Sequence, residues 1–362
     1  MLPARFTRLL AVLLLGLLVT ACANRQLAEL PTVPDEVITY AGDVVEDNFV
    51  NPDGLNIFGR YWLPVTPPRA AVVLVHGTIM HSGLYDEFGR YLAARGYVVY
   101  GIDLQGWGRS DGIGPRGDVY NYDKYVSDVA LVIDRLRIEY PGIPVFGFGE
   151  SLGGAVVLLG QVQRRSFFDG LLLSAPAFKP RPGFGVMRPP EIINDWGLSM
   201  AGWFGKKFPR MPTPIVANRL TMGIMVKDKE VARAMVRDPY VTHSLLPARY
   251  ISALNEAIKF LQQHIEVINV PMLVIHGNKD ILVPVSSSRE LTTRTLSRDT
   301  TLAVYEGMHH AAMIQPHRYQ AMMDFRRWLD LRTTPSATAY SGQTVPALRN
   351  SPQPACPEAV GC

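Results

Sequence analysis

The sequence has little of what marks a nucleic-acid binder, a disulfide scaffold or a membrane-spanning protein. Its formal charge is only +4 over 362 residues and no basic block occurs, so DNA or RNA binding is not expected. The cysteines are Cys22, Cys356 and Cys362, and none lies in the body of the chain, which excludes a disulfide framework. Hydrophobic residues make up 48% of the chain, which is enough to bury a full core and excludes wholesale disorder.

The N-terminus carries the pattern of a secretory signal. Arg5 and Arg8 precede an apolar run, Leu9–Val19, which is too short for the ~20 residues that a membrane-spanning helix needs. The run leads into Val19-Thr20-Ala21-Cys22, which resembles a bacterial lipobox, where the cysteine is lipidated and becomes the mature N-terminus. The alternative is an ordinary cleaved signal, or a plain anchor, with an incidental cysteine.

We therefore predict a lipoprotein signal peptide over residues 1–21, lipidation at Cys22 and a tether over residues 22–42. Acyl chains on Cys22, at about 0.8 kcal/mol per buried CH₂, would hold the protein on a membrane of the cell envelope. Ala23 rather than aspartate follows the cysteine, which favours the outer membrane if the source is Gram-negative.

Between residues 43 and 332, short apolar runs alternate with segments of helical period. The runs are near-continuously apolar, as buried parallel strands require. They lie at 71–75, 97–102, 145–148, 171–173, 272–275 and 302–305, and a strand-like stretch at 55–63 precedes them. In Tyr122–Glu139 the apolar residues fall on one face of a helix. This alternation predicts an α/β fold with a mostly parallel sheet covered on both faces, and the Asn51–Gly54 turn predicts an antiparallel opening hairpin.

Two segments depart from the alternation. Residues 177–265 contain no comparable strand and hold six of the 13 methionines, so we predict a lid there, because insertions between strands lie over the carboxyl edge of such sheets. Extra helical core is the alternative. Residues 333–362 are rich in Pro, Ser and Thr and are predicted to be disordered. Whether Cys356 and Cys362 pair stays open.

Gly149-Glu150-Ser151-Leu152-Gly153 has the pattern G-x-S-x-G. An apolar strand precedes it and a helical stretch, 155–163, follows, which is the context of a nucleophile elbow. The strained turn requires small neighbours, which Gly149 and Gly153 supply. Ser151 is therefore the candidate nucleophile, against the alternative of a glycine-rich turn with an incidental serine.

A serine nucleophile needs a base and an acid that orients it, and in this fold both follow the serine in the chain. Asp280 follows the strand at 272–275 and is the candidate acid, although a solvated turn aspartate would look the same. His309 and His310 follow the next strand, and either could be the base. The backbone N–H groups of Leu152 and Thr78 are the candidate oxyanion donors.

Taken together, these motifs resemble the monoacylglycerol lipase and lysophospholipase (serine aminopeptidase S33-like) family of α/β hydrolases, over residues 45–331. The segments that carry the resemblance are Leu74–Gly77, His81–Tyr85, Asp103–Ser110, the elbow, Arg237–Pro239, Asp280 and Tyr305–His310. The resemblance implies an eight-stranded sheet with a helical lid between strands six and seven. The family's histidine lies three residues after the glycine of the last motif, which selects His310.

The resemblance also implies hydrolysis of carboxylic esters with one long acyl chain, such as a monoacylglycerol or lysophospholipid, through an acyl-enzyme. No metal or organic cofactor is needed, and the sequence gives no oligomeric state. The turn Thr78-Ile79-Met80 and the lid segment 182–220 depart from the family pattern, which leaves the substrate open. Alternatives with the same triad are a short-chain esterase or an S33-like peptidase, for which the lid offers acidic Glu191 and Asp195. A catalytically inactive envelope binding protein is a further alternative.

Overall fold

The computed structural model describes residues 42–164, 166–180, 202–213, 228–315 and 318–333, together with residues 40, 200, 222, 223, 225 and 226. The predicted signal peptide, Cys22, nearly all of the tether, much of the lid interval and the tail with Cys356 and Cys362 lie outside these residues. Within the described ranges, the structure contains no helix with the length and apolar character needed to cross a membrane.

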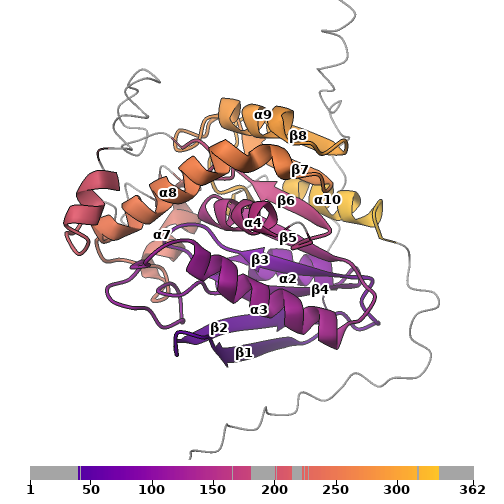
Figure 1. Cartoon of the computed structure of the whole chain (residues 1–362). Helices are drawn as coiled ribbons and strands as arrows, with labels where there is room; N and C mark the ends of the chain where they lie inside the picture. Colours follow the sequence, from indigo (N-terminus) through magenta and orange to yellow (C-terminus); the bar gives the residue numbers. More distant parts are fainter. Residues whose placement is uncertain are drawn as a thin grey trace, which may run out of the picture.

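Eight strands form one sheet in the order β1-β2-β4-β3-β5-β6-β7-β8 (Figure 1). The β1–β2 and β2–β4 pairs are antiparallel and the remaining pairs are parallel, so the predicted fold class and the opening hairpin are confirmed. The strands are β1 Val44–Val50, β2 Asn56–Trp62, β3 Ala70–Val75, β4 Tyr97–Ile102, β5 Val145–Glu150, β6 Gly170–Ser174, β7 Met272–Gly277 and β8 Thr300–Tyr305.

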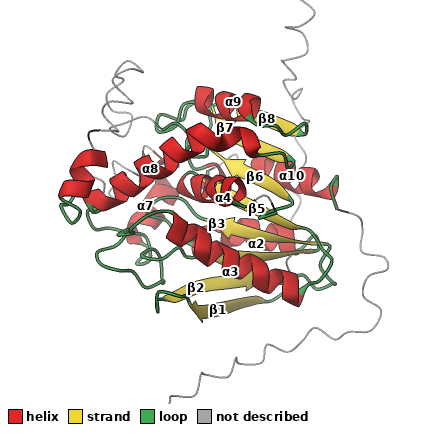
Figure 2. Ribbon diagram, in the orientation of Figure 1, coloured by secondary structure: helices red, strands yellow, loops and turns green. Residues whose placement is uncertain are grey.

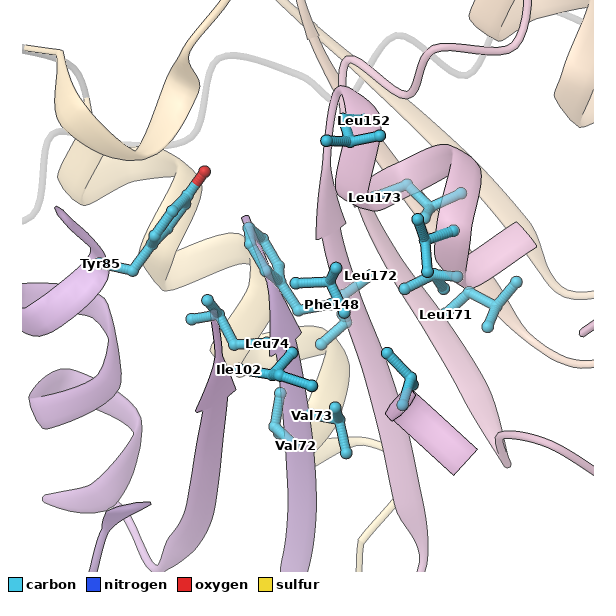
Figure 3. Packing of buried hydrophobic residues seen from close by; sticks show 14 of the residues in the cluster. Val72, Val73, Leu74, Tyr85, Ile102, Phe148, Leu152, Leu171, Leu172 and Leu173 are labelled. Atoms are coloured by element: carbon cyan, nitrogen blue, oxygen red, sulfur yellow. The ribbon is translucent and has the colours of Figure 1, made fainter. Parts of the chain in front are cut away.

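Burial along each strand follows its place in the sheet. Every residue of the central strands β3 to β7 is buried, because helices cover both faces, and this explains their continuous apolar sequences. The edge strands β1 and β8 have mixed burial. The hydrophobic core between the sheet and its helices contains large side chains, among them Phe148, Tyr85 and Leu173 (Figure 3).

Helices lie on both faces of the sheet, with α3, α4 and α8 in front and α2 and α10 behind in the view of Figure 2. Their bounds are α2 Asp86–Ala93, α3 Asp123–Glu139, α4 Leu152–Gln163, α7 Lys229–Arg237, α8 Ala248–His264, α9 Val285–Arg294 and α10 Arg318–Asp330, with short 3₁₀ turns η1 Ser82–Tyr85, η3 Ile265–Val267 and η4 Ala312–Ile314. The apolar face predicted for 122–139 is confirmed as the buried face of α3.

Candidate active site

Ser151 lies at a sharp turn between β5 and α4. Its backbone has φ 54° and ψ −111°, a strained conformation for a residue other than glycine, and α4 begins at the next residue. A Cβ on Gly149 would clash with the Gly153 carbonyl, and one on Gly153 would clash with the Val75 carbonyl. The turn therefore has the local geometry of the predicted elbow. The strand runs to Glu150, two residues beyond the predicted 145–148, because its ladder to β6 continues up to the turn.

The structure brings Asp280 and His310 together from loops that are 30 residues apart. His310 Nδ1 lies 2.7 Å from Asp280 Oδ2, and both side chains are almost fully buried. The other carboxylate oxygen of Asp280 accepts the backbone N–H groups of Leu282 and Val283, which fixes the orientation of the carboxylate. A carboxylate held in this way selects the tautomer in which Nδ1 carries the proton and Nε2 is free to act as a base.

The charges of this pair reinforce one another. Burial alone would raise the pKa of the Asp280 carboxyl, but the charge of His310 and hydrogen bonds from His276 and His310 hold that pKa well below its usual range. Burial alone would lower the pKa of His310, but the Asp280 carboxylate, with a smaller contribution from Glu150, raises it. The pair is therefore arranged to stabilise a positive charge on His310 when it takes up a proton.

The sequence interpretation missed His276, which the structure places against the acid. His276 Nε2 lies 3.1 Å from Asp280 Oδ2, and its Nδ1 lies 2.7 Å from Ser288 Oγ. The sequence alone does not distinguish it from an ordinary histidine at a strand end. The available signal was its spacing, because it lies at the end of a buried strand four residues before the predicted acid.

The two candidate oxyanion donors come from the start of α4 and from the turn after β3. Leu152 is the first residue of α4, so its N–H has no acceptor within the helix. The turn that contains Thr78 packs against the nucleophile, because a Cβ on Gly77 would lie 3.7 Å from the Ser151 Cβ. His76 Nδ1 lies 2.7 Å from the Gly77 carbonyl oxygen. In the trans peptide between Gly77 and Thr78, the Thr78 N–H points in the direction opposite to the Gly77 carbonyl. By holding that carbonyl, His76 helps to set the direction of the Thr78 N–H.

Because His76 is fully buried, we expect it to make the folding stability depend on pH. Burial, with a smaller effect from His81, lowers the pKa of His76 from 6.5 to about 4, and its Nε2 accepts the Leu104 N–H, which a protonated ring could not do. The unfolded chain therefore binds this proton at a higher pH than the folded chain. We therefore expect His76 to contribute a loss of stability on the order of 3 kcal/mol as the pH drops from about 6.5 to about 4.

Urea unfolding at several pH values measures this dependence. The matched variant His76→Gln keeps an acceptor for Leu104 but cannot take up a proton, so its stability should change less over this range. If the free energy of unfolding changed equally with pH in wild type and variant, another group would be the cause of the lower stability in acid.

Described residues of the predicted lid interval contact the turn after β3. The Thr242 N–H donates to the Ile79 carbonyl at 2.9 Å, and Tyr250 OH lies 2.5 Å from Thr78 Oγ1. His81 Nε2 lies 3.0 Å from Asp238 Oδ2. These contacts connect the segment around α7 and α8 to the carboxyl edge of the sheet, where Ser151 lies. Its action as a lid stays a prediction, since residues 181–199 and 214–221 are outside the described ranges.

Among the contacts of the described residues, none joins Ser151 Oγ to the His310 ring. Hydrogen bonds between a nucleophile and its base often tighten only in the Michaelis complex. The site thus contains a serine on a strained turn, a histidine oriented by a buried carboxylate at the same sheet edge, and N–H groups beside the serine. This set of groups suits nucleophilic attack on a carbonyl carbon.

Comparison with known proteins agrees with this geometry. The family model described as serine aminopeptidase, S33, matches residues 66–317. Monoacylglycerol lipase of Mycolicibacterium smegmatis is 31% identical over 78% of this chain and 96% of its own length. Human monoglyceride lipase is 28% identical over 81% of this chain and 92% of its own length.

Solved structures show the same fold. Monoacylglycerol lipase of Paleococcus ferrophilus has a TM-score of 0.63 at 23% identity, covering 79% of this chain and 98% of its own. A soluble variant of monoglyceride lipase from Saccharomyces cerevisiae, in complex with a substrate analogue, has a TM-score of 0.70 at 21% identity, covering 85% and 100%. The chain therefore belongs to the monoacylglycerol lipase family of α/β hydrolases, within the group described as serine aminopeptidase, S33.

Proposed function

We propose that this chain is a lipid-anchored serine hydrolase that cleaves the ester bond of long-chain monoacylglycerols or lysophospholipids. The observation that carries the proposal is the pairing of His310 with Asp280 at 2.7 Å, at the sheet edge that also carries Ser151 on its strained turn. Membership of a family with monoacylglycerol lipases among its members supports the ester substrate.

In the proposed acylation step, Ser151 Oγ attacks the ester carbonyl carbon while His310 Nε2 takes the hydroxyl proton. The carbonyl oxygen becomes an oxyanion, which the N–H groups of Leu152 and Thr78 stabilise. When the intermediate collapses, the bond to the alcohol breaks and His310 returns its proton to that alcohol. The acyl group is then esterified to Ser151.

Deacylation repeats these steps with water. His310 Nε2 removes a proton from a water molecule while the water oxygen attacks the acyl carbon. The second tetrahedral intermediate forms in the same oxyanion site. The proton then passes from His310 to Ser151 Oγ as the bond to the fatty acid breaks. Asp280 keeps the imidazole oriented and stabilises its positive charge in both halves of the reaction.

The proposed anchor is an acylated Cys22 in a cell-envelope membrane, the outer membrane in a Gram-negative source. The lipobox-like segment 19–22 supports this, and a tether of the length of residues 22–42 would leave the domain free to reach lipids of the same membrane. Cys22→Ser in the full chain should move the protein from the detergent phase to the aqueous phase on detergent partitioning. Unchanged partitioning would refute anchoring through Cys22.

A panel of esters from acetyl to stearoyl, with monoacylglycerol and lysophospholipid included, tests the proposed substrate. We expect serine-dependent turnover with kcat/KM at least about 10-fold higher for palmitoyl than for acetyl esters, because each buried CH₂ contributes about 0.8 kcal/mol. Ser151→Ala supplies the background rate.

Turnover confined to short acyl chains would overturn the lipid substrate and favour the short-chain esterase. Cleavage of peptides with a free N-terminus, without ester turnover, would favour the peptidase. If neither the wild type nor Ser151→Ala turned over any substrate, the catalytically inactive binding protein would be favoured.

A further inference from the structure

Glu150, the residue before the nucleophile, is a buried carboxyl group that the steps above do not use. It ends β5, a strand whose other side chains are apolar or glycine, and its exposed fraction is 0%. A carboxyl group in such a place is costly unless hydrogen-bond donors surround it. The donors that do so come from three other segments of the active site.

One carboxyl oxygen connects to the oxyanion turn. Tyr85 OH donates to Glu150 Oε1 at 3.0 Å, and the same hydroxyl oxygen accepts the Gly77 N–H at 3.2 Å. A phenol has a single proton, and the carboxyl oxygen at 3.0 Å is a stronger acceptor for it than Met80 Sδ at 3.4 Å, so the hydroxyl lone pairs are left to accept the Gly77 N–H. Glu150 thus fixes the residue that precedes Thr78, whose N–H is the proposed oxyanion donor.

The second carboxyl oxygen connects to the strand beside Ser151 and to the histidine loop. Ser174 Oγ donates to Glu150 Oε2 at 2.8 Å, and the carbonyl of Ser174 accepts the Ser151 N–H at 2.9 Å. The Met313 N–H, three residues beyond His310, lies 3.4 Å from the same oxygen and is the longest of these contacts. Both carboxyl oxygens therefore act as acceptors, as in an ionised carboxylate.

We propose that Glu150 is a positioning residue that holds the oxyanion turn and the His310 loop in place around Ser151. This inference rests on the proposed function. The groups that contact the carboxylate come from three elements: Tyr85 of η1, Ser174 of β6, and the Met313 N–H of η4, three residues after His310. Burial raises the pKa of Glu150, while the Ser174 hydrogen bond, the charge of His310 and the Tyr85 hydrogen bond oppose that rise. Its charge in turn favours protonated His310.

Two variants separate positioning from charge. In Glu150→Gln both the charge and one acceptor are lost, so kcat should fall about 10- to 100-fold with little change in KM, and the acid limb of the kcat/KM profile should move to lower pH because His310 loses an anion. In Tyr85→Phe the link to Gly77 is lost but the charge remains, so kcat should fall while the acid limb stays in place.

Asp128→Asn is the matched control. Asp128 is also buried and accepts side-chain hydrogen bonds, from Asn51 and Gln105, but it lies on α3 outside the site. This variant should leave kcat and the pH profile unchanged. Thermal unfolding of each variant identifies losses caused by misfolding, and if Glu150→Gln fails to fold, Tyr85→Phe decides the positioning claim.

Suppose that the wild-type protein hydrolyses long-chain esters. If Glu150→Gln then has the same kcat and the same acid limb as the wild type, the inference is overturned and the proposed function is left intact. If the wild type hydrolyses no long-chain ester, the proposed function fails instead. The rate at which a fluorophosphonate labels Ser151 then tests Glu150, because that reaction needs the same oxyanion site and base. A rate equal to wild type in Glu150→Gln would again overturn the inference, and a slower rate would support it.

Discussion

Ser151→Ala should lower kcat for a long-chain ester by about 10⁵- to 10⁶-fold, since it removes the atom that bonds to the acyl carbon. Every later step of the mechanism depends on that bond. The residual rate should exceed the uncatalysed rate, because the oxyanion donors and the acyl site remain. Initial rates on a palmitoyl ester, with the protein quantified by folded fraction, measure the loss.

Ser127→Ala is a suitable control for this variant. Ser127 lies on α3 and its hydroxyl donates to the Asp123 carbonyl, so its loss touches no group of the site. We expect wild-type rates from it and unchanged thermal unfolding from both variants. A Ser151→Ala protein that kept a tenth of wild-type kcat would refute the nucleophile assignment.

Asp280→Asn should lower kcat by about 10⁴-fold, the second-largest effect we expect. The asparagine amide can donate its NH₂ group to His310 Nδ1. This favours the tautomer with the proton on Nε2, and a protonated Nε2 cannot take the proton of Ser151. Loss of the carboxylate also lowers the pKa of His310, which Asp280 now raises. The acid limb of the remaining activity should therefore lie at lower pH than in wild type.

Rates and pH profiles of Asp280→Asn, beside Asp128→Asn as the remote carboxyl control, test this expectation. A large loss of kcat without a shift of the acid limb would contradict the electrostatic part of the argument. Activity within about 10-fold of wild type would contradict the assignment of the acid itself.

The fold was predictable because the parallel strands are buried on both faces and therefore carry uninterrupted apolar sequences. The order of Ser151, Asp280 and His310 follows from where strands end, and the choice between His309 and His310 needed the family spacing. The contact of His310 with Asp280 agrees with that choice, although the catalytic roles stay predictions until they are measured.

Other parts of the site could not be predicted from local sequence. The contacts of Glu150 with Tyr85 and Ser174, and of His276 with Asp280, join side chains whose approach depends on the whole sheet. The end of β5 was placed two residues early, since Gly149 and Glu150 do not look like strand residues although the ladder to β6 includes them. The lid was predicted from its place between two strands, and that placement does not fix the conformation of residues 177–265.

Labelling with a long-chain alkyl fluorophosphonate tests the central claim most directly, because the reagent bonds only to a serine that a nearby base activates. We expect one equivalent to bond to Ser151 by peptide mapping, labelling to be lost in His310→Gln, and long-chain monoacylglycerol to slow it. Labelling at another residue, or labelling of Ser151 that His310→Gln leaves unchanged, would contradict the account.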